Sequence, residues 1–449
     1  WSAHDHQMPT FAHLTCKFAW VSVAHGVYAL AYGHQCATIP TILLVIGIRG
    51  PPHFGDKCQS LFDANSGFNK AFNFERSAAR SFLRDMKLSK LIAALEQWAP
   101  LSLQEAYDNS GLQLGDPNME ILSAMVCLDC TETVIEEAAM QNCQLIISHH
   151  PLIFRGLKCL SGNGYVERTL RAAIKHDIAL YAIHTNLDNV HDGVNGEIAS
   201  RLRLKPMGVL EPKVDLLRKL SVFVPHSHAE QVREAMFRAG AGHVGDYDEC
   251  SFNVEGTGTF RGTEGTVPYV GKIGERHKEP ETRVEVIYPV FKERMIISTM
   301  REAHPYEEVA YDLVPLHNRH PRVGSGLVGE WDKPLSEQEF LARLKEVFGL
   351  KTLRHSKLLG RPIKRVGMCG GSGAFLINRS KSEGVDAYIT GDVKYHEFFD
   401  ADGSLLLADI GHFGSEQFTM HLIQRRLAQL FPTFAVRLTK IVTDPIYHY

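Results

Sequence analysis

The sequence lacks a run of apolar residues long enough to cross a membrane. Its most apolar stretch, residues 41–48, is far shorter than the roughly 20 residues that a membrane-spanning helix requires. The first residues also lack the charged start and the clean apolar core of a secretion signal. We therefore expect a cytoplasmic protein without a membrane partner.

The chain also lacks an excess of charge of either sign. Its 48 Lys and Arg residues nearly balance its 51 Asp and Glu residues, so no general attraction to nucleic acid is implied. The nine cysteines are scattered, and only Cys127 and Cys130 have redox-like spacing. Both lie at the end of an apolar strand, where packing is the simpler role. These features indicate a reducing, cytosolic compartment.

What the sequence does contain is four short apolar segments that each end in metal-binding residue types. They are residues 145–151, 179–188, 387–397 and 405–416. Short apolar runs bounded by Gly, Pro or polar residues are typical of buried strands. In open α/β sheets, ligands collect at the carboxyl ends of the strands. The four segments therefore predict one polar site, assembled from both halves of the chain.

The residues at these strand ends suit Zn, Fe, Mn or Co, because imidazole and carboxylate are their common ligands. His149 and His150 can bind one ion only if the chain turns at Pro151; otherwise each histidine binds a different ion. His412 and Glu416 share one face if a helix begins there. A single histidine at a strand end is usually a capping residue, but that explanation is weak for a whole set.

Further residues in the same segments have less certain roles. Asp188 stands where a carboxylate can bridge two cations. His184 and His396 could bind metal or support the residues that do. They are also our candidates for general acid or base, since histidine titrates near neutral pH. Asp392 and Asp409 are expected to cap helices or to end strands.

Several ordered motifs in the chain resemble a known protein family. They are residues 107–113, 148–154, 184–188, 390–397 and 411–416. In type and spacing they are similar to the GTP cyclohydrolase 1 type 2 homologues, or NIF3-like proteins, over residues 86 to 449. The resemblance implies two divalent metal ions per subunit, bridged by a carboxylate and held by His149, His150, Asp188, His412 and Glu416. It also implies a ring-shaped homo-oligomer, a hexamer.

Residues 1–85 differ from the rest of the chain. They have no sustained helical or strand period, whereas an amphipathic helix begins at Met86 with apolar residues at Leu88, Leu91 and Leu95. We interpret residues 1–85 as a non-native or disordered extension. The alternative is a targeting presequence with arginines near its end. Neither interpretation gives this segment a catalytic residue.

The remaining chain divides into three parts. Residues 86–213 and 324–449 each alternate strands and helices, which predicts an α/β fold. Residues 214–323 have the order β-α-β-β-α-β of a ferredoxin-like module, and the family resemblance implies an inserted domain similar to PII and CutA proteins. The expected fold is thus a discontinuous NIF3-like α/β metal-binding domain with an inserted α+β domain.

Two glycine-rich runs lack the lysine and the spacing of nucleotide-binding loops. Gly256–Gly258 is predicted to form a hairpin turn. Gly370–Gly373 joins a strand to a helix N-terminus, where it could accept a substrate phosphate. In the inserted part, polar residues within 304–308 are expected either to face the metals or to cap a strand.

These features lead to two hypotheses of function. The first is a dinuclear metal-dependent hydrolase that acts on a small nucleotide-like or phosphorylated substrate through metal-activated water. The family name implies opening of the GTP ring system. The alternative is a metal-binding regulatory or metal-trafficking protein without turnover, whose site would be closed or reversibly filled. Turnover that depends on Glu416 would distinguish the first from the second.

Overall fold

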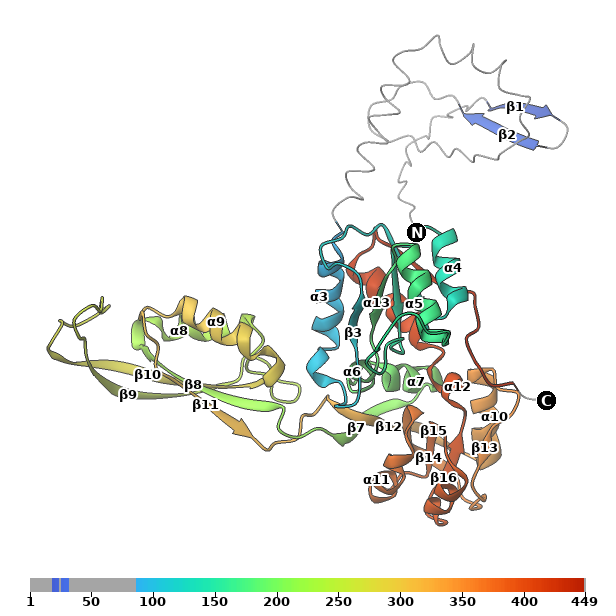
Figure 1. Ribbon diagram of the computed structural model, residues 1–449. Coiled ribbons are helices and arrows are strands. Elements are labelled where there is room, and N and C mark those ends of the chain that lie inside the picture. Colours follow the sequence, from blue (N-terminus) through green and yellow to red (C-terminus); the bar gives the residue numbers. More distant parts are fainter. Residues whose placement is uncertain (1–17, 24–25, 32–85, 448–449) are drawn as a thin grey trace, which may run out of the picture. The chain divides into compact units, whose positions relative to one another are not determined.

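The computed structural model describes residues 18–23, 26–31 and 86–447 (Figure 1). The chain divides into two compact units, Trp1–Glu75 and Arg76–Tyr449. In the first unit, strands β1 (Phe18–Val23) and β2 (Gly26–Ala31) pair in antiparallel fashion. The prediction that residues 1–85 are an extension otherwise lies outside the described residues.

A five-stranded sheet in the second unit has the order β17-β4-β5-β6-β3. Its strands are β3 (Gly111–Leu114), β4 (Ser123–Cys127), β5 (Leu145–Ser148), β6 (Ala179–Ala182) and β17 (Ala435–Leu438). All are parallel except β3. Every residue of β4, β5 and β6 is buried, because helices cover both faces of the sheet. Burial on both faces explains why these strands read as unbroken apolar runs.

A six-stranded sheet has the order β13-β16-β15-β14-β12-β7. Its strands are β7 (Lys205–Pro212), β12 (Gly324–Leu335), β13 (Arg354–His355), β14 (Ile363–Ser372), β15 (Ala387–Gly391) and β16 (Leu406–Asp409). Strands β14, β15 and β16 are parallel, whereas β7 and β12 pair in antiparallel fashion. The β7–β12 pair joins the two segments that flank residues 214–323.

Helices pack around both sheets (Figure 1). They are α3 (Leu88–Trp98), α4 (Glu132–Met140), α5 (Tyr165–Lys175), α6 (Thr185–Asp188), α7 (Val194–Leu202), α10 (Glu337–Phe348), α11 (Ile377–Ser382), α12 (His412–Glu416) and α13 (Thr419–Leu430). Short 3-10 turns are η1 (Leu101–Leu103), η4 (Ala374–Leu376) and η5 (Tyr395–Ala401). Helix α10 begins at a capping box, in which Ser336 Oγ accepts a hydrogen bond from the Glu339 backbone N–H.

One hydrophobic core is continuous between the two sheets. It includes Val126 and Tyr181 from the first sheet, Val366 and Leu406 from the second, and Ile198 from α7. Because residues far apart in the chain share this core, the carboxyl ends of strands from both halves are held in fixed positions. The alternation of strands and helices thus produces the mixed α/β fold that the sequence predicts.

Residues 214–323 form a separate antiparallel sheet of order β11-β8-β10-β9. The elements are β8 (Leu217–Pro225), η2 (His226–His228), α8 (Ala229–Arg238), β9 (Ser251–Arg261), β10 (Arg276–Pro289), η3 (Val290–Lys292), α9 (Glu293–Ala303) and β11 (Tyr311–Leu316). Their order is the β-α-β-β-α-β order that the sequence predicts. This sheet and its two helices have their own hydrophobic core, which includes Leu220, Met236 and Met300.

The predicted hairpin turn at Gly256–Gly258 is wrong. These residues lie in the middle of strand β9, where Gly256 pairs with Glu281 and Gly258 pairs with Glu279 of β10. A Cβ atom on Gly258 would lie 2.1 Å from the carboxylate of Glu281. Close packing against a neighbouring side chain, not a turn, therefore accounts for this glycine.

No helix in the described part of the chain is long and apolar enough to cross a membrane. Cys127 and Cys130 are both buried, and burial raises the pKa of the Cys130 thiol to about 12. Neither thiol is therefore disposed to form the thiolate that redox chemistry needs.

Candidate metal centre

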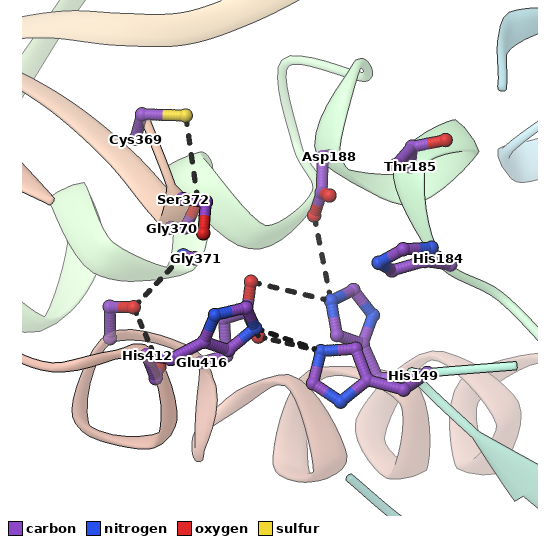
Figure 2. Close-up of polar contacts among 12 residues, drawn as sticks. His149, His184, Thr185, Asp188, Cys369, Gly370, Gly371, Ser372, His412 and Glu416 are labelled. Atoms are coloured by element: carbon purple, nitrogen blue, oxygen red, sulfur yellow. Dashed lines mark hydrogen bonds and ion pairs between the residues drawn. The ribbon is translucent and has the colours of Figure 1, made fainter. Parts of the chain in front are cut away.

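The strand ends named from the sequence meet at one place between the two sheets (Figure 2). His149 and His150 directly follow β5, and Asp188 is the last residue of α6, just beyond β6. His412 and Glu416 are the first and last residues of α12, just beyond β16. The predicted helix therefore exists, and its i, i+4 spacing places the His412 Nε2 atom 3.0 Å from Glu416 Oε2.

His149 and Asp188 point toward each other without forming a hydrogen bond. The His149 ring is fully buried, and its Nδ1–H donates to the Ile183 carbonyl oxygen at 2.8 Å. Its Nε2 lies 3.7 Å from both Asp188 Oδ1 and Glu416 Oε1. Among the described residues, neither His149 Nε2 nor Asp188 Oδ1 has a hydrogen-bond partner. Buried polar atoms are normally paired, so these two donors fit a cation held between them.

His150 and His412 approach the other oxygen of the same carboxylate. The His150 Nε2 atom is 3.0 Å from Glu416 Oε2, and it is 3.1 Å from His412 Nε2. The adjacent histidines therefore face different oxygens of Glu416: His149 faces Oε1 and His150 faces Oε2. The two histidines could therefore serve different ions, but His149, His150 and His184 are also close enough to share one ion.

Three overlapping groups of side chains have the spacing needed to hold a metal ion. They are His149, Asp188 and Glu416; His150, His412 and Glu416; and His149, His150 and His184. In each group the potential ligand atoms lie within 4.8 Å of one another. The buried cluster could therefore hold metal, and its nitrogen and oxygen donors match the ligands of borderline divalent cations.

Three outer carboxylates orient three of the histidines. The pairs, each with 2.7 Å between the ring Nδ1 and a carboxylate oxygen, are His150 with Asp129, His412 with Asp392 and His184 with Asp108. Because each Nδ1–H donates to a carboxylate, each Nε2 is directed into the cluster. Such outer partners fix the tautomer of a ligating histidine and increase its basicity.

Two of these carboxylates were not recognised as site residues from the sequence, although signals for both were present. Asp129 follows β4, the parallel neighbour of β5, so it shares a sheet edge with His150. Asp108 lies in a motif of the family resemblance, and it also accepts hydrogen bonds from Ser110 Oγ and the Thr185 backbone N–H. It therefore ties the start of α6 to the 107–113 segment.

The electrostatics of Glu416 and Asp188 differ although both are carboxylates. Burial opposes ionisation of Glu416, but its interactions with His149, His150 and His412 outweigh burial and hold the pKa of this carboxyl well below its usual range. Burial, together with the negative charge of Glu416, raises the pKa of Asp188 to about 7. Without a cation, the cluster thus favours one ionised carboxylate over two.

The Gly370–Gly373 run does not form the predicted anion site. Its amides are already used: Gly370 N–H donates to Asn195 Oδ1 at 3.0 Å, Gly371 N–H to Ser415 Oγ at 2.9 Å, and Gly373 N–H to Thr390 Oγ1 at 2.9 Å. These three backbone N–H groups are therefore not free to bind a phosphate. The glycines instead let the backbone pass close to the cluster (Figure 2).

Gly371 illustrates this close approach. It has a φ of +61°, and a Cβ atom added to it would lie 2.4 Å from Glu416 Oε1. Any other residue would therefore be strained and would push against the central carboxylate.

Two other residues named from the sequence lie elsewhere or have a structural role. His396 is exposed on η5, where its ring is 5.2 Å from Tyr395 and 6.4 Å from Phe399, and it belongs to none of the three groups. The structure therefore does not bring His396 to the cluster. Asp409 ends its strand as expected, accepting hydrogen bonds from the Gly411 and Val393 backbone N–H groups at 2.9 and 3.0 Å.

Asp129→Asn is expected to weaken metal binding by roughly 10–100-fold, the usual cost of losing an outer partner of a ligating histidine. A neutral amide can no longer increase the basicity of the His150 ring. Asp129 also accepts a hydrogen bond from Thr443 Oγ1 at 2.7 Å, so Thr443→Val should have a smaller effect in the same direction. Competition with a metallochromic indicator measures both affinities. Asp246→Asn, on an exposed aspartate of the inserted part, should leave affinity unchanged.

Residues 86–445 match the family described as Duf34/NIF3 (NGG1p interacting factor 3). The chain is 42% identical over 325 residues to the GTP cyclohydrolase 1 type 2 homolog of Halalkalibacterium halodurans, covering 72% of this chain and 87% of that protein. It is 38% identical over 343 residues to the Bacillus subtilis protein of the same name, covering 76% and 92%. The crystal structure of a Bacillus cereus protein related to NIF3 superposes with a TM-score of 0.73 at 35% identity, covering 81% of this chain and 99% of that one.

Proposed function

The chain belongs to the Duf34/NIF3 family, and from this premise we propose that it is a dinuclear metal-dependent hydrolase. The proposed substrate is small and either nucleotide-like or phosphorylated. The observation that carries the proposal is the position of Glu416, whose two carboxylate oxygens face two different sets of histidines. One shared carboxylate between two sets of donors is the arrangement that a two-cation site requires.

In this proposal, one cation is held by His149, Asp188 and Glu416, and the other by His150, His412 and Glu416. Glu416, and not Asp188, would then be the carboxylate that contributes to both positions. Each cation would have three protein donors, which leaves coordination positions for water and substrate, as catalytic sites require. Zn, Fe, Mn and Co all accept this donor set.

Two bound divalent cations would lower the pKa of a water molecule toward neutrality and polarise the bond under attack. His184 is the protein group best placed to move a proton there. Its Nδ1–H is held by Asp108, so its Nε2 faces the rings of His149 and His150, whose centroids are both 5.3 Å from its own. His184 either completes one cation's ligand set or acts as general acid or base. His396 stays a weaker candidate, because it would have to approach from η5.

Metal affinity is expected to rise with pH. Burial opposes protonation of both the His150 and the His412 ring. Hydrogen bonds to Asp129 and Glu416 nevertheless raise the pKa of His150 to about 9. Hydrogen bonds to Asp392 and Glu416 raise the pKa of His412 to about 11. Both pKa values exceed the ordinary 6.5 of histidine. Protonation of the two rings therefore stabilises the folded, metal-free protein fully below about pH 6.5, and this stabilisation is lost as the pH rises through 9 and 11. A metal ion must displace the same protons.

Calorimetry of metal binding in two buffers with different ionisation heats measures the displaced protons. We expect about two protons to be released at pH 7.5, one from each ring. Binding heat that does not depend on the buffer would contradict the assignment of these two nitrogens as ligands.

The experiment that tests the proposed activity is a hydrolysis screen with the metal-loaded full chain. Because the relatives are named for GTP cyclohydrolase, GTP comes first, followed by other nucleoside triphosphates and by simple phosphoesters. We expect ring opening or phosphate release that requires metal and disappears in Glu416→Gln. If metal is retained at stoichiometric levels but no substrate turns over, the regulatory or trafficking role becomes the better account.

Three further expectations follow from the family resemblance and from the composition. The inserted part is a module similar to PII and CutA proteins, consistent with its β-α-β-β-α-β order. The protein assembles as a homohexamer, which light scattering would measure. It acts in the cytoplasm on a small molecule, with neither a membrane nor nucleic acid as partner.

A further inference from the structure

A cavity of about 620 Å³ lies in the inserted part, between strand β9, strand β10 and the residues that follow α9. Its lining includes Glu281 and Tyr306, together with residues 254–262. Tyr306, Glu307 and Glu308 also line this cavity. His304 does not line it, and its Nε2–H donates a hydrogen bond to the Phe223 carbonyl oxygen at 3.0 Å. None of them belongs to the metal-binding groups. The cavity therefore raises a separate question of binding.

A buried carboxylate without a cation faces this cavity. Glu281 is only 8% exposed. In the part of the chain that the structure describes, its carboxylate has no Lys, Arg or His partner, and its side-chain hydrogen bond comes from the Tyr306 hydroxyl at 3.0 Å. A carboxylate removed from water without a counter-charge is costly. A cationic ligand in the cavity would remove that cost.

Aromatic rings stand beside this carboxylate. The Tyr306 ring centroid is 5.8 Å from that of Phe260 and 6.3 Å from that of Tyr269. All three residues line the cavity, with Phe223 as a fourth aromatic residue. The faces of such rings attract cations, and the attraction is stronger where water is excluded. The walls therefore suit an apolar ligand body that carries a positive charge.

Glycine keeps the space next to Glu281 open. A Cβ atom added to Gly258 would lie only 2.1 Å from a carboxylate oxygen of Glu281, so a larger residue would crowd this carboxylate. Strand β9 is an edge strand, so this wall of the cavity is formed by one strand whose glycines add no bulk.

The charges that surround the cavity do not neutralise Glu281. The lining also contains three exposed acidic residues, Glu255, Glu307 and Glu308. Its basic residues are Arg261 and Arg283. A further acidic residue engages one of these arginines: Arg283 Nε lies 3.2 Å from Glu285 Oε1. The lining thus carries more negative than positive charge.

From these observations we propose that the cavity binds a small organic ammonium ion, whose N–H groups donate to Glu281 and whose apolar body packs on Phe260, Tyr269 and Tyr306. This site is independent of the metal centre and of the hydrolase activity. A protonated primary amine fits better than a metal ion, because the walls supply one buried carboxylate and several apolar rings.

The proposal is tested with 2-phenylethylammonium and its neutral analogue 2-phenylethanol, titrated by calorimetry into the metal-loaded full chain. A hydrogen bond between oppositely charged groups should favour the ammonium ion over the neutral analogue by at least about tenfold in Kd. Glu281→Gln keeps the shape and removes the charge, and it should abolish that preference. Glu302→Gln, at an exposed position of α9 outside the cavity, should leave both affinities unchanged.

The proposal is overturned if the ammonium ion does not bind, if the neutral analogue binds equally well, or if Glu281→Gln binds like the wild type. Circular dichroism verifies that the variants fold. If Glu281→Gln does not fold, Tyr269→Leu replaces it, because this ring is 53% exposed and carries no buried charge. Its loss should weaken ammonium binding roughly two- to fivefold and leave 2-phenylethanol less affected; equal weakening of both would overturn the proposal.

Discussion

Glu416→Gln is expected to remove metal from the whole cluster and not from half of it. The reason is that Glu416 supplies one oxygen to each set of histidines, so a neutral amide weakens both positions at once. We expect metal content to fall from about two equivalents per subunit to almost none after dialysis. The loss of affinity should exceed the roughly 10–100-fold cost of removing an outer partner.

Elemental analysis of the dialysed protein measures this result, with two variants for comparison. Asp188→Asn removes a ligand from one position only, so about one equivalent should remain. Glu346→Gln, at an exposed position of α10, should retain the full content. If Glu416→Gln retained as much metal as the wild type, Glu416 would not be the shared ligand.

Gly371→Ala should also disable the metal centre, although the substitution adds only a methyl group. The new Cβ would lie 2.4 Å from Glu416 Oε1 at a φ of +61°. The left-handed backbone alone should cost about 1–2 kcal/mol of stability. Displacement of the carboxylate should add a loss of metal that backbone strain does not cause.

Gly384→Ala is the matched control for this variant. Gly384 has a φ of +65°, and a Cβ atom there would meet nothing within 4 Å. Thermal unfolding of the metal-free proteins should therefore show a similar loss of stability in the two variants, while metal content falls only in Gly371→Ala. Equal metal content in both variants would show that Glu416 can shift without consequence.

The strands and the residues that end them could be predicted from the sequence for a physical reason. Strands β4, β5 and β6 are buried on both faces, so their apolar runs are unbroken and the polar residues that follow stand out. Because β4, β5 and β6 are parallel, the residues that follow them lie at one edge of the five-stranded sheet. His149 and Glu416 follow strands of different sheets, and the hydrophobic core shared by the two sheets holds them close together.

What could not be predicted depends on side-chain geometry between elements. No spacing rule shows that Asp129 and Asp108 hold histidines, since each contact joins residues far apart in the chain. The sequence places Asp188 where a carboxylate can bridge two cations, but only the structure shows that Glu416 lies between two sets of histidines. The glycines at 371 and 258 were interpreted as loop or turn residues, whereas each makes room for a carboxylate of another element.

Anomalous X-ray diffraction from crystals of the metal-loaded full chain tests the central claim most directly. We predict two anomalous peaks roughly 3.5–4 Å apart, the usual separation in two-metal sites. One should lie between His149 and Asp188, the other between His150 and His412, and both should contact Glu416. A single peak, or peaks away from Glu416, would contradict the assignment of this cluster as a carboxylate-bridged two-metal centre.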